Sequence, residues 1–467
     1  MIIEQIYTGC LAQGAYYIES NGEAAVIDPL REIQPYIDRA NEDGAKIKYV
    51  FETHFHADFV SGHIDLAKKT NATIVFGPEA ETGFDSYTAK DNEEFKIGEI
   101  TLKVLHTPGH TPESSCYLLI DEQGEEHAVF SGDTLFLGDV GRPDLAIKSD
   151  VTKEDLAGML YDSLRNKVMT LGDDIIVYPA HGAGSACGKN LSKETVGTIG
   201  EQKKTNYALR ANMTKKEFIK EVLDGMPPPP QYFAKNAMMN KSGYEEFDTV
   251  LKTGNVALVP EEFEALANHE GALVLDVRHQ KDYIEGHIPN SIFIGLNGSF
   301  APWVGALIND LKQPLLLVVP EGKSKEAVTR LSRVGYDNTL GYLKGGLDSW
   351  KAAGKDIESL ESISAEEFAN RLTTQDLNVI DVRKDGEYRS MHLENVQHFS
   401  LDEINSNMNA IDKNKVYHIY CAGGYRSVIA ASILKARGFK VVDIAGGFVA
   451  IKNTKLPVTD YVCPTTL

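Results

Sequence analysis

Histidine and aspartate side chains recur in the first part of the chain, at the ends of apolar runs. The first group, THFHAD, directly follows the run IKYVFE and holds His54, His56 and Asp58. Later groups end further apolar runs beside Gly or Pro, namely His110 in HTPGHTPES, Asp133 in FSGDTLF and His181 in VYPAHG. Imidazole and carboxylate groups are common ligands of transition metals. A single buried histidine is more often a hydrogen-bonded core residue, but several such groups together predict a metal site.

A second reactive group is the cysteine of CAGGYRS, which runs from Cys421 to Ser427 between the strand VYHIY and the helical run SVIAASILKARGF. The glycines allow successive backbone N–H groups to converge on the sulfur. The N-terminus of the helix and the side chain of Arg426 favour a thiolate over a thiol. A cysteine at a strand end is usually a small apolar core residue, but this surrounding sequence predicts that Cys421 is a nucleophile.

The chain has five cysteines, an odd number at wide spacing, which predicts free thiols in a reducing compartment. Cys187, in GAGSACGKN, follows His181 by a few residues and is expected at the rim of the metal site. It is either a second thiol, besides Cys421, that relays sulfur, or a passive loop thiol. Cys10 and Cys116 lie in or beside apolar strands and are expected in the core, and Cys463 has no expected role.

An internal duplication organises the second half of the chain. The segment LVLDVRHQKDYIEGHI at 273–288 returns as NVIDVRKDGEYRSMHL at 378–393, an offset of 105 residues. Near its end each copy has Gly-Gly and an apolar residue, and within each copy β-branched runs alternate with amphipathic helical stretches. This pattern is typical of an open α/β domain with a parallel sheet. We therefore expect two such domains, at 251–357 and 358–467.

The first copy differs from the second at the position that could carry sulfur. Its strand LLLVV runs into PEGKSK at 320–325, and no cysteine occurs between Cys187 and Cys421. This copy cannot hold a persulfide, so we expect a spacer and packing surface that positions the other copy. Binding of an anionic group by the charged side chains of this loop is a weaker alternative.

Residues 1 to about 200 are strand-rich, with short strands such as AAVID, ATIVF and ITLKVL separated by Gly, Pro and Asp turns. The segment MPPPPQYFAKNAMMNKSG at 226–243 is predicted to be an extended connector that interrupts any helix and packs on the first domain, because its four consecutive prolines cannot donate backbone hydrogen bonds. With this connector, the first domain is placed at 1–250.

Length and composition are those of a globular multidomain protein. The 467 residues suggest about three domains, with 42% apolar and 24% charged residues. A formal net charge of −20 argues against a nucleic-acid partner. The N-terminus shows no leader pattern and no run approaches a membrane span, so we expect a cytoplasmic protein without a membrane partner. The oligomeric state stays open, a homo-oligomer included.

The groups THFHAD, PGHTPE, GDTLF and PAHG resemble the metal motifs of the metallo-β-lactamase superfamily. The resemblance covers residues 1 to about 250 and implies an αββα sandwich with the site at its edge. The two-metal hydrolases of this superfamily have a histidine directly after the aspartate of the first motif, where this chain has Phe59. A dinuclear hydrolase, which needs both ions to position hydroxide, is therefore disfavoured, although His63 could substitute for the missing ligand.

The same domain is similar to persulfide dioxygenases, which use one Fe(II) per chain. The resemblance implies three metal ligands that leave open positions for the persulfide sulfur and O2, namely His54, His110 and Asp133. It implies three further groups that orient the ligands or hydrogen-bond the substrate, unless they are remnants of a two-metal site, namely His56, Asp58 and His181. The segment GDVGRPDL resembles a loop that borders the site, so Arg142 either contacts substrate or is a solvated surface residue.

CAGGYRS, together with IDVR and GGF, resembles an active rhodanese domain, with Met391 before His392 where the family usually has Gly. The middle copy resembles an inactive rhodanese. Over its full length the chain resembles three-domain persulfide dioxygenase–rhodanese fusions, including a cysteine in the loop of Cys187. This resemblance adds catalytic roles for Cys421 and Arg426, and a relay role for Cys187.

The resemblance implies that a low-molecular-weight thiol persulfide is oxidised by O2 to sulfite, and that sulfur from a second persulfide passes through Cys421 to give thiosulfate. Such a reaction would serve hydrogen sulfide detoxification. Three alternatives stay open: a glyoxalase II-like thioester hydrolase with two metal ions, a β-lactamase-like hydrolase, and a non-catalytic sulfur-carrier scaffold. Whether the thiol is glutathione, coenzyme A or another carrier is not encoded in any motif.

Overall fold

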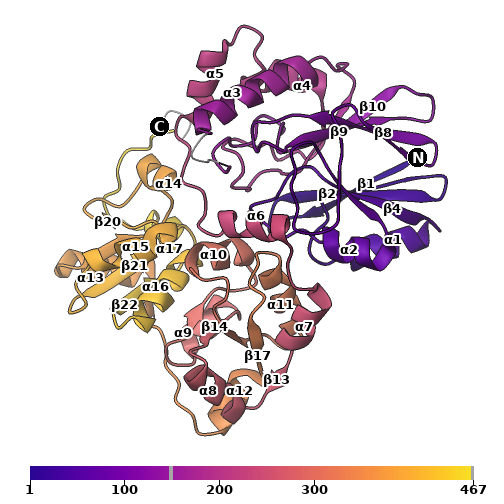
Figure 1. Cartoon of the computed structure of the whole chain (residues 1–467). Coiled ribbons are helices and arrows are strands. Elements are labelled where there is room, and N and C mark those ends of the chain that lie inside the picture. The colour runs from indigo at the N-terminus through magenta and orange to yellow at the C-terminus, as the bar shows by residue number, and fades with distance from the viewer. Residues whose placement is uncertain (147–150, 464–467) are drawn as a thin grey trace. The chain divides into compact units, whose positions relative to one another are not determined.

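The structure is a computed structural model that describes residues 1–146 and 151–463. The chain forms two compact units, one of Met1–Thr249 with Leu331–Gly335 and the other of Val250–Arg330 with the chain from Tyr336 onward. Their helices and strands are drawn in Figure 1. No described helix combines the length and apolar composition that spanning a membrane requires.

The first unit contains two six-stranded sheets of mixed strand direction. The strands of the first sheet are, in spatial order, β1 (Ile2–Thr8), β2 (Gln13–Ser20), β3 (Glu23–Ile27), β4 (Lys46–Glu52), β5 (Thr73–Phe76) and β6 (Tyr87–Thr88). Those of the second are β12 (Gly197–Thr198), β11 (Ile176–Pro179), β10 (Glu126–Gly132), β9 (Ser115–Ile120), β8 (Ile100–His106) and β7 (Glu94–Ile97).

Apolar side chains from both sheets pack against one another and form the inner core of this unit. Tyr16 and Phe51 of the first sheet belong to the same buried cluster as Ile100, Tyr117 and Phe130 of the second. Alternate residues of a strand face opposite sides of the sheet, so each sheet has a second face to cover.

Helices cover that outer face of the first sheet. Val26 and Val50 pack there with Tyr36 of α1 (Gln34–Glu42) and Leu66 of α2 (His63–Thr70). The sheet face is thereby closed by two amphipathic helices.

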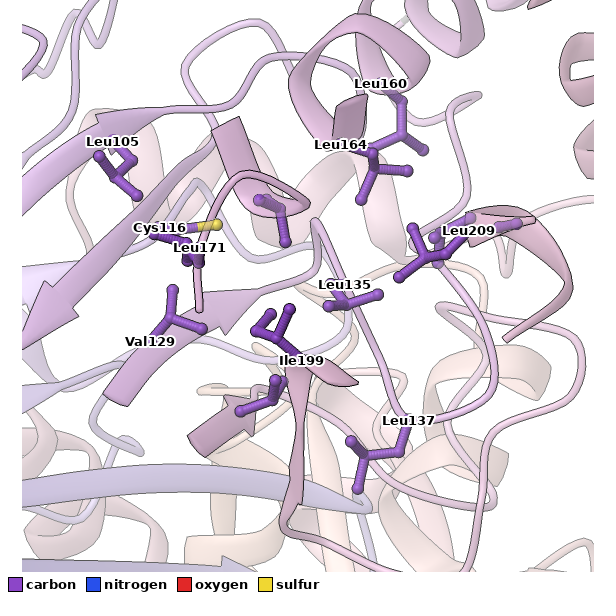
Figure 2. Packing of buried hydrophobic residues seen from close by; sticks show 14 of the residues in the cluster. Leu105, Cys116, Val129, Leu135, Leu137, Leu160, Leu164, Leu171, Ile199 and Leu209 are labelled. Carbon is purple, nitrogen blue, oxygen red and sulfur yellow. The ribbon is translucent and has the colours of Figure 1, made fainter. Parts of the chain in front are cut away.

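The outer face of the second sheet packs against α3 (Lys153–Ser163), α4 (Ile199–Thr205) and α5 (Lys215–Leu223). Figure 2 shows part of this cluster, in which Cys116 and Val129 of the sheet are buried with Leu160 of α3. The prediction of an αββα sandwich is confirmed, and so is the core position of Cys116, which is fully buried. The same expectation for Cys10 is wrong, because this cysteine is only partly buried.

The predicted strands of this unit are confirmed as β3, β4, β5 and β8. The connector at 226–243 is only partly extended, and here the prediction was wrong. The prolines at 227–230 lie outside any helix, but α6 (Phe233–Ser242) begins three residues after the last of them. Proline excludes only the helix positions that need its N–H, so a helix can form beyond it.

The second unit contains two five-stranded parallel sheets. The strands of the middle domain are, in spatial order, β13 (Ala257–Leu258), β17 (Thr339–Leu343), β16 (Leu315–Val318), β14 (Leu273–Asp276) and β15 (Ile292–Phe293). Those of the C-terminal domain are β18 (Ser362–Ile363), β22 (Lys440–Ile444), β21 (Val416–Tyr420), β19 (Asn378–Asp381) and β20 (Gln397–His398). The two orders correspond strand for strand, which confirms the duplication.

Helices join the strands of both sheets. From the start of the middle domain they are α7 (Phe247–Gly254), α8 (Pro260–His269), α9 (Gln280–Glu285), α10 (Phe300–Leu307), α11 (Ser324–Ser332) and α12 (Gly346–Ala352). The C-terminal domain adds α13 (Ala365–Thr374), α14 (Asp385–Ser390), α15 (Ile404–Asn407), α16 (Arg426–Ala436) and α17 (Gly447–Ile451). Strands alternating with helices produce the parallel sheets expected from the sequence pattern.

Candidate metal centre and sulfur-transfer loop

The predicted metal ligands of the first unit meet in one buried cluster. His54 follows β4 and Asp133 follows β10, while His110 lies between β8 and β9. His110 Nε2 is 3.4 Å from Asp133 Oδ2, and His54 Nε2 is 3.9 Å from the same oxygen. His181, which follows β11, has Nε2 3.5 Å from Asp133 Oδ1. All four side chains are buried.

Hydrogen bonds on the far nitrogen of each imidazole decide which nitrogen faces Asp133. His110 Nδ1 is 2.8 Å from the carbonyl oxygen of Arg142, and His181 Nδ1 is 3.3 Å from that of Ala12. A carbonyl oxygen only accepts, so Nδ1 carries the proton in the neutral form of both residues. Nε2 is then the nitrogen with the free lone pair.

His54 takes the same form through Thr53. The hydroxyl of Thr53 donates to Asp28 Oδ2 at 2.9 Å, because a carboxylate only accepts. The hydroxyl oxygen is therefore left to accept from His54 Nδ1, which lies 2.9 Å away. Like the other two imidazoles, His54 presents Nε2 to the carboxylate of Asp133.

These atoms fit a bound cation. Within the described chain, His110 Nε2, His181 Nε2 and both carboxylate oxygens of Asp133 are buried without a hydrogen-bond partner. Burial lowers the pKa of His54 and of His110, so both imidazoles favour the neutral, metal-binding form. Buried acceptors that face one another are costly unless a positive charge lies between them.

His56 lies beside the cluster but turns one nitrogen away from it. Its Nε2 is 3.0 Å from Asp28 Oδ1 and 3.5 Å from Glu52 Oε2. Burial acts to lower the pKa of His56, but Asp28 and then Glu52 raise it to about 9. Single donor atoms of His56, Asp58 and His181 still lie within 4.8 Å of one another. The residues predicted to surround the ligands are thus brought together.

The positions that bear on a second metal ion are Phe59, where two-metal hydrolases have a histidine, and His63, the possible substitute. Burial raises the pKa of Asp58, and the fully buried ring of Phe59 lies 4.4 Å from that of His56. His63, the substitute ligand considered from the sequence, starts α2 and has Nδ1 3.5 Å from Glu52 Oε1. Burial lowers the pKa of His63 to about 3. The structure thus places His63 beside Glu52.

Cys187 is buried beside the cluster of predicted metal ligands, not at its rim. Its side chain is 1% exposed, and its sulfur lies within 4.8 Å of donor atoms of Asp133 and His181. Burial, and then the carboxylates of Asp58 and Asp133, raise the pKa of this thiol. A bound cation would act in the opposite direction.

Arg142 is not a solvated surface residue, because it is 2% exposed. Its guanidinium binds both carboxylate oxygens of Asp144, at 2.7 and 2.9 Å, and the carbonyl oxygen of Ala186 at 3.1 Å. Its backbone N–H donates to the carbonyl oxygen of Cys187, and its own carbonyl accepts from His110. Arg142 therefore connects the loop of Cys187 to His110, a predicted ligand, while a contact with substrate stays a prediction.

Two residues that shape the site were missed from the sequence. Asp28 accepts from both the backbone and the hydroxyl of Thr53, and Asn240 of α6 donates to the carbonyl oxygens of His56 and Phe59, both at 2.7 Å. Asp28 ends the apolar run AAVID and precedes proline, so the signal that marked the other groups could have found it. No sequence feature marks Asn240.

In the second unit, Cys421 directly follows β21 and is 1% exposed. The backbone N–H of Gly424 donates to its sulfur at 3.1 Å, and Ser427 Oγ lies 3.6 Å from the same atom. Gly424 has φ +94°, a conformation that favours glycine. Since α16 begins at Arg426, the predicted strand, loop and helix are confirmed.

The guanidinium of Arg426 forms an ion pair with the carboxylate of Glu387. Its two terminal nitrogens donate to Glu387 at 2.6 and 2.8 Å. The observed donor on the sulfur of Cys421 is therefore a backbone N–H, and support of the thiolate by Arg426 stays a prediction.

The middle domain has the same loop without the cysteine. Its loop spans 319–323 between β16 and α11, as the loop of the C-terminal domain spans 421–425 between β21 and α16. Val319 therefore takes the place of Cys421.

Comparison with known families assigns both parts of the chain. The profile of the Metallo-beta-lactamase superfamily matches residues 8–181, and that of the Rhodanese-like domain matches 259–353 and 364–454. A metallo-beta-lactamase from Staphylococcus aureus subsp. aureus COL is 33% identical, with a TM-score of 0.65 over 74% of this chain and 98% of that structure. The chain belongs to the metallo-β-lactamase superfamily, and two rhodanese-like domains follow its metallo-β-lactamase domain.

Curated relatives of the first domain carry two different names. A probable hydroxyacylglutathione hydrolase, glo2 of Schizosaccharomyces pombe, is 35% identical over 161 residues, 34% of this chain and 58% of that protein. The mitochondrial persulfide dioxygenase ETHE1 of Homo sapiens is 28% identical over 215 residues, 45% of this chain and 74% of that protein. The chain spans 58% and 60% of the length of two such hydrolases from S. pombe.

Proposed function

We propose that the first domain, at 1–250, oxidises a low-molecular-weight thiol persulfide with O2 to sulfite, using one Fe(II) held by His54, His110 and Asp133. The observation that carries this proposal is the buried grouping of His54, His110 and Asp133, whose donor atoms all lie within 4.8 Å of one another, with both carboxylate oxygens of Asp133 unpartnered among the described residues. Two histidines and one carboxylate are the donor set of mononuclear non-haem iron sites, where the metal supplies redox chemistry toward O2. The relative named persulfide dioxygenase supports the same choice.

The chain's own residues orient the site and exclude water. Thr53 and the carbonyl oxygen of Arg142 fix the tautomers of His54 and His110, so both present Nε2. We assign Asp58 and His181, with His56, to the orientation of ligands and the hydrogen bonding of substrate. Overall, one persulfide, one O2 and one water give one thiol and one sulfite.

A hydrolase with two metal ions is the second candidate. It is supported by the grouping of His56, Asp58 and His181 and by the relatives named hydroxyacylglutathione hydrolase. Against it, Nε2 of His56 faces Asp28, and Phe59 cannot bind metal. The same two features disfavour a β-lactamase-like hydrolase.

We propose that the C-terminal domain, at 358–467, transfers sulfane sulfur. The thiolate of Cys421 attacks the outer sulfur of a second persulfide, which releases the thiol and leaves a cysteine persulfide. Sulfite then attacks the outer sulfur, so thiosulfate leaves and the thiolate of Cys421 is restored. The N–H of Gly424, which donates to Sγ at 3.1 Å, stabilises the negative charge in both steps.

Cys187 is proposed as a sulfur relay, since its buried sulfur lies beside Asp133 and His181. The domain at 251–357 carries no cysteine and is assigned no chemistry. The substrates are small molecules, and we place the protein in the cytoplasm, in hydrogen sulfide detoxification.

Metal content and O2 uptake test the main proposal. Anaerobically purified protein is expected to hold about one Fe(II) per chain and to consume O2 when persulfide is added. His110→Ala removes one of three ligands and should abolish both properties. His127→Ala, a change to a partly buried histidine of β10, is the matched control and should keep both. Two zinc ions per chain with thioester hydrolysis, and no persulfide-dependent O2 uptake, would favour the hydrolase instead.

A further inference from the structure

α16, the helix that follows the sulfur-transfer loop, is buried on every side. All residues from 427 to 434 are buried. A helix that packs only on its own sheet keeps a polar face toward solvent. One side of α16 contacts β21 and β22 of its own domain, and it also contacts β15, the edge strand of the middle sheet. The helix of one rhodanese-like domain therefore covers the sheet edge of the other.

A buried hydrogen bond joins these two elements. The backbone N–H of Phe293 in β15 donates to Ser432 Oγ of α16 at 2.9 Å. An edge strand has N–H groups that its own sheet leaves unpaired. Here Ser432 of α16 supplies the acceptor, so this buried N–H of the edge strand is satisfied.

The segment that follows β15 encloses the side chain of Tyr425. The hydroxyl of Tyr425 donates to the carbonyl oxygen of Gly295 at 2.7 Å. The ring meets that of Phe293 edge-on, with centroids 5.9 Å apart. A Cβ added at Gly298 would lie 2.3 Å from the ring of Tyr425, so this position has room only for glycine. We call residues 295–298 the Tyr425 socket.

The socket is held by the middle domain itself. Arg330 of α11 donates to the carbonyl oxygens of Leu296 and Gly298, at 2.6 and 3.2 Å. Arg330 is 8% exposed. A buried guanidinium that binds two carbonyl groups fixes the backbone on which Tyr425 rests.

We propose that the cysteine-free middle domain positions the sulfur-transfer loop of its neighbour, by holding Tyr425 in this socket. Tyr425 directly follows Gly424, whose N–H donates to the sulfur of Cys421. Two glycines precede Tyr425 in the loop, and glycine permits many backbone conformations. Anchoring Tyr425 restricts them to the one that directs this N–H at the sulfur. Tyr425 is thus a positioning residue, and its effect on turnover rests on the proposed sulfur transfer.

Two single changes, one in each domain, test the socket in the full-length protein. Tyr425→Phe keeps the ring and removes the hydroxyl, and Gly298→Ala disturbs the socket without changing any residue of the C-terminal domain. Both should lower kcat for thiosulfate:thiol sulfur transfer about fivefold, the factor expected for one net hydrogen bond, with KM for thiosulfate unchanged. Both should also move the alkylation of Cys421 by iodoacetamide, followed on its own peptide by mass spectrometry, to higher pH.

A matched control and a double variant separate positioning from general damage. Lys325→Ala changes an exposed side chain on the middle domain and should leave both readouts as in the parent. Gly298→Ala combined with Tyr425→Ala should behave like Tyr425→Ala alone, because the clash needs the ring. Strictly additive effects of these two changes would contradict the socket.

The alkylation readout does not depend on sulfur transfer. If the parent protein transfers no sulfur, the proposed function fails, yet the pH profile of Cys421 alkylation still tests the socket. If Tyr425→Phe keeps the parent's profile while circular dichroism shows it folded, the positioning role is refuted. Should Gly298→Ala fail to fold, Tyr425→Phe decides the question alone.

Discussion

Single hydroxyl and carbonyl groups decide which tautomer the proposed ligand histidines take. His54 and His110 are suited to bind metal in the neutral form, because Thr53 and a backbone carbonyl hold the proton on Nδ1. Groups of this kind contribute to affinity without touching the metal. The affinity of the proposed site for metal should therefore change when a residue that does not itself bind the metal is substituted.

Replacing Thr53 by valine tests this at the level of one residue. Thr53→Val keeps the shape of the side chain but removes the hydroxyl that accepts from His54 and donates to Asp28. Iron affinity is expected to fall roughly 10- to 100-fold, the usual effect of losing such a partner. Competition with a chelator under anaerobic conditions measures it. Thr53→Ser, which keeps the hydroxyl, should retain most of the affinity, and equal affinities in all three proteins would contradict the role of this hydrogen bond.

A buried carboxyl behind the sulfur-transfer loop makes stability depend on pH. Burial raises the pKa of Asp443 from 3.8 to about 6, although the hydroxyls of Ser427 and Ser362 lower it. The folded protein therefore binds more protons than the unfolded chain between about pH 4 and 6, and stability falls as pH rises through that window. The charged form costs about 3 kcal/mol near neutral pH.

Asp443→Asn removes this titration and should flatten the pH dependence of unfolding. Its amide oxygen can still accept from Ser362, whose hydroxyl donates to Asp443 at 2.8 Å. Urea unfolding of the full chain at pH 5 and pH 7.5 measures the difference. The variant is expected to gain stability over the parent at the higher pH, and the same decrease in both proteins would show that Asp443 is not the group responsible.

At the scale of elements, the ends of strands bring the proposed ligands together. The chain packs so closely at these strand ends that one position has no room for a side chain. Gly132, the last residue of β10, has φ +53°, and a Cβ at this position would lie 2.7 Å from the side chain of Thr53. A larger residue would strain the backbone and displace Thr53, whose hydroxyl hydrogen-bonds His54. Glycine at position 132 thus leaves Thr53 in place to hydrogen-bond His54, a proposed ligand.

Gly132→Ala should lower both stability and metal content. The strained backbone costs about 1–3 kcal/mol, and the displaced Thr53 no longer holds His54. Gly124→Ala is the matched control, since Gly124 has φ +84° in the turn before β10 but nothing within 4 Å of an added Cβ. Thermal unfolding and iron analysis should show a stability loss in both variants but a metal loss only in Gly132→Ala. A metal loss of equal size in both would contradict the packing argument.

The sequence predicted elements whose signal is local. The strands β3, β4, β5 and β8, the duplication and the loop of Cys421 follow from apolar periodicity and glycine placement. The role of Asn240 depends on hydrogen bonds to residues more than 180 positions away, which no local pattern contains. The same holds for the Tyr425 socket, because no local sequence pattern marks its residues.

At the scale of the whole molecule, the two proposed chemistries fall in two separate compact units. The ligands lie in the first unit and Cys421 in the second, and each unit has hydrophobic clusters of its own. Units with separate cores unfold and tolerate damage independently. The duplication adds a second copy without a cysteine, so the proposed sulfur transfer depends on one residue.

The two chemistries should therefore be separable by single changes. Cys421→Ser leaves the metal site untouched, so persulfide-dependent O2 uptake should persist while sulfite accumulates where the parent releases thiosulfate, because serine cannot carry a transferable sulfur. His54→Ala should do the reverse, stopping O2 uptake while thiosulfate:thiol transfer at Cys421 continues. Oxygen electrode traces and product analysis on both variants measure the two activities side by side. If Cys421→Ser stopped O2 uptake as completely as His54→Ala does, Cys421 would have to act in the oxidation itself, and the assignment of one chemistry to each unit would be wrong.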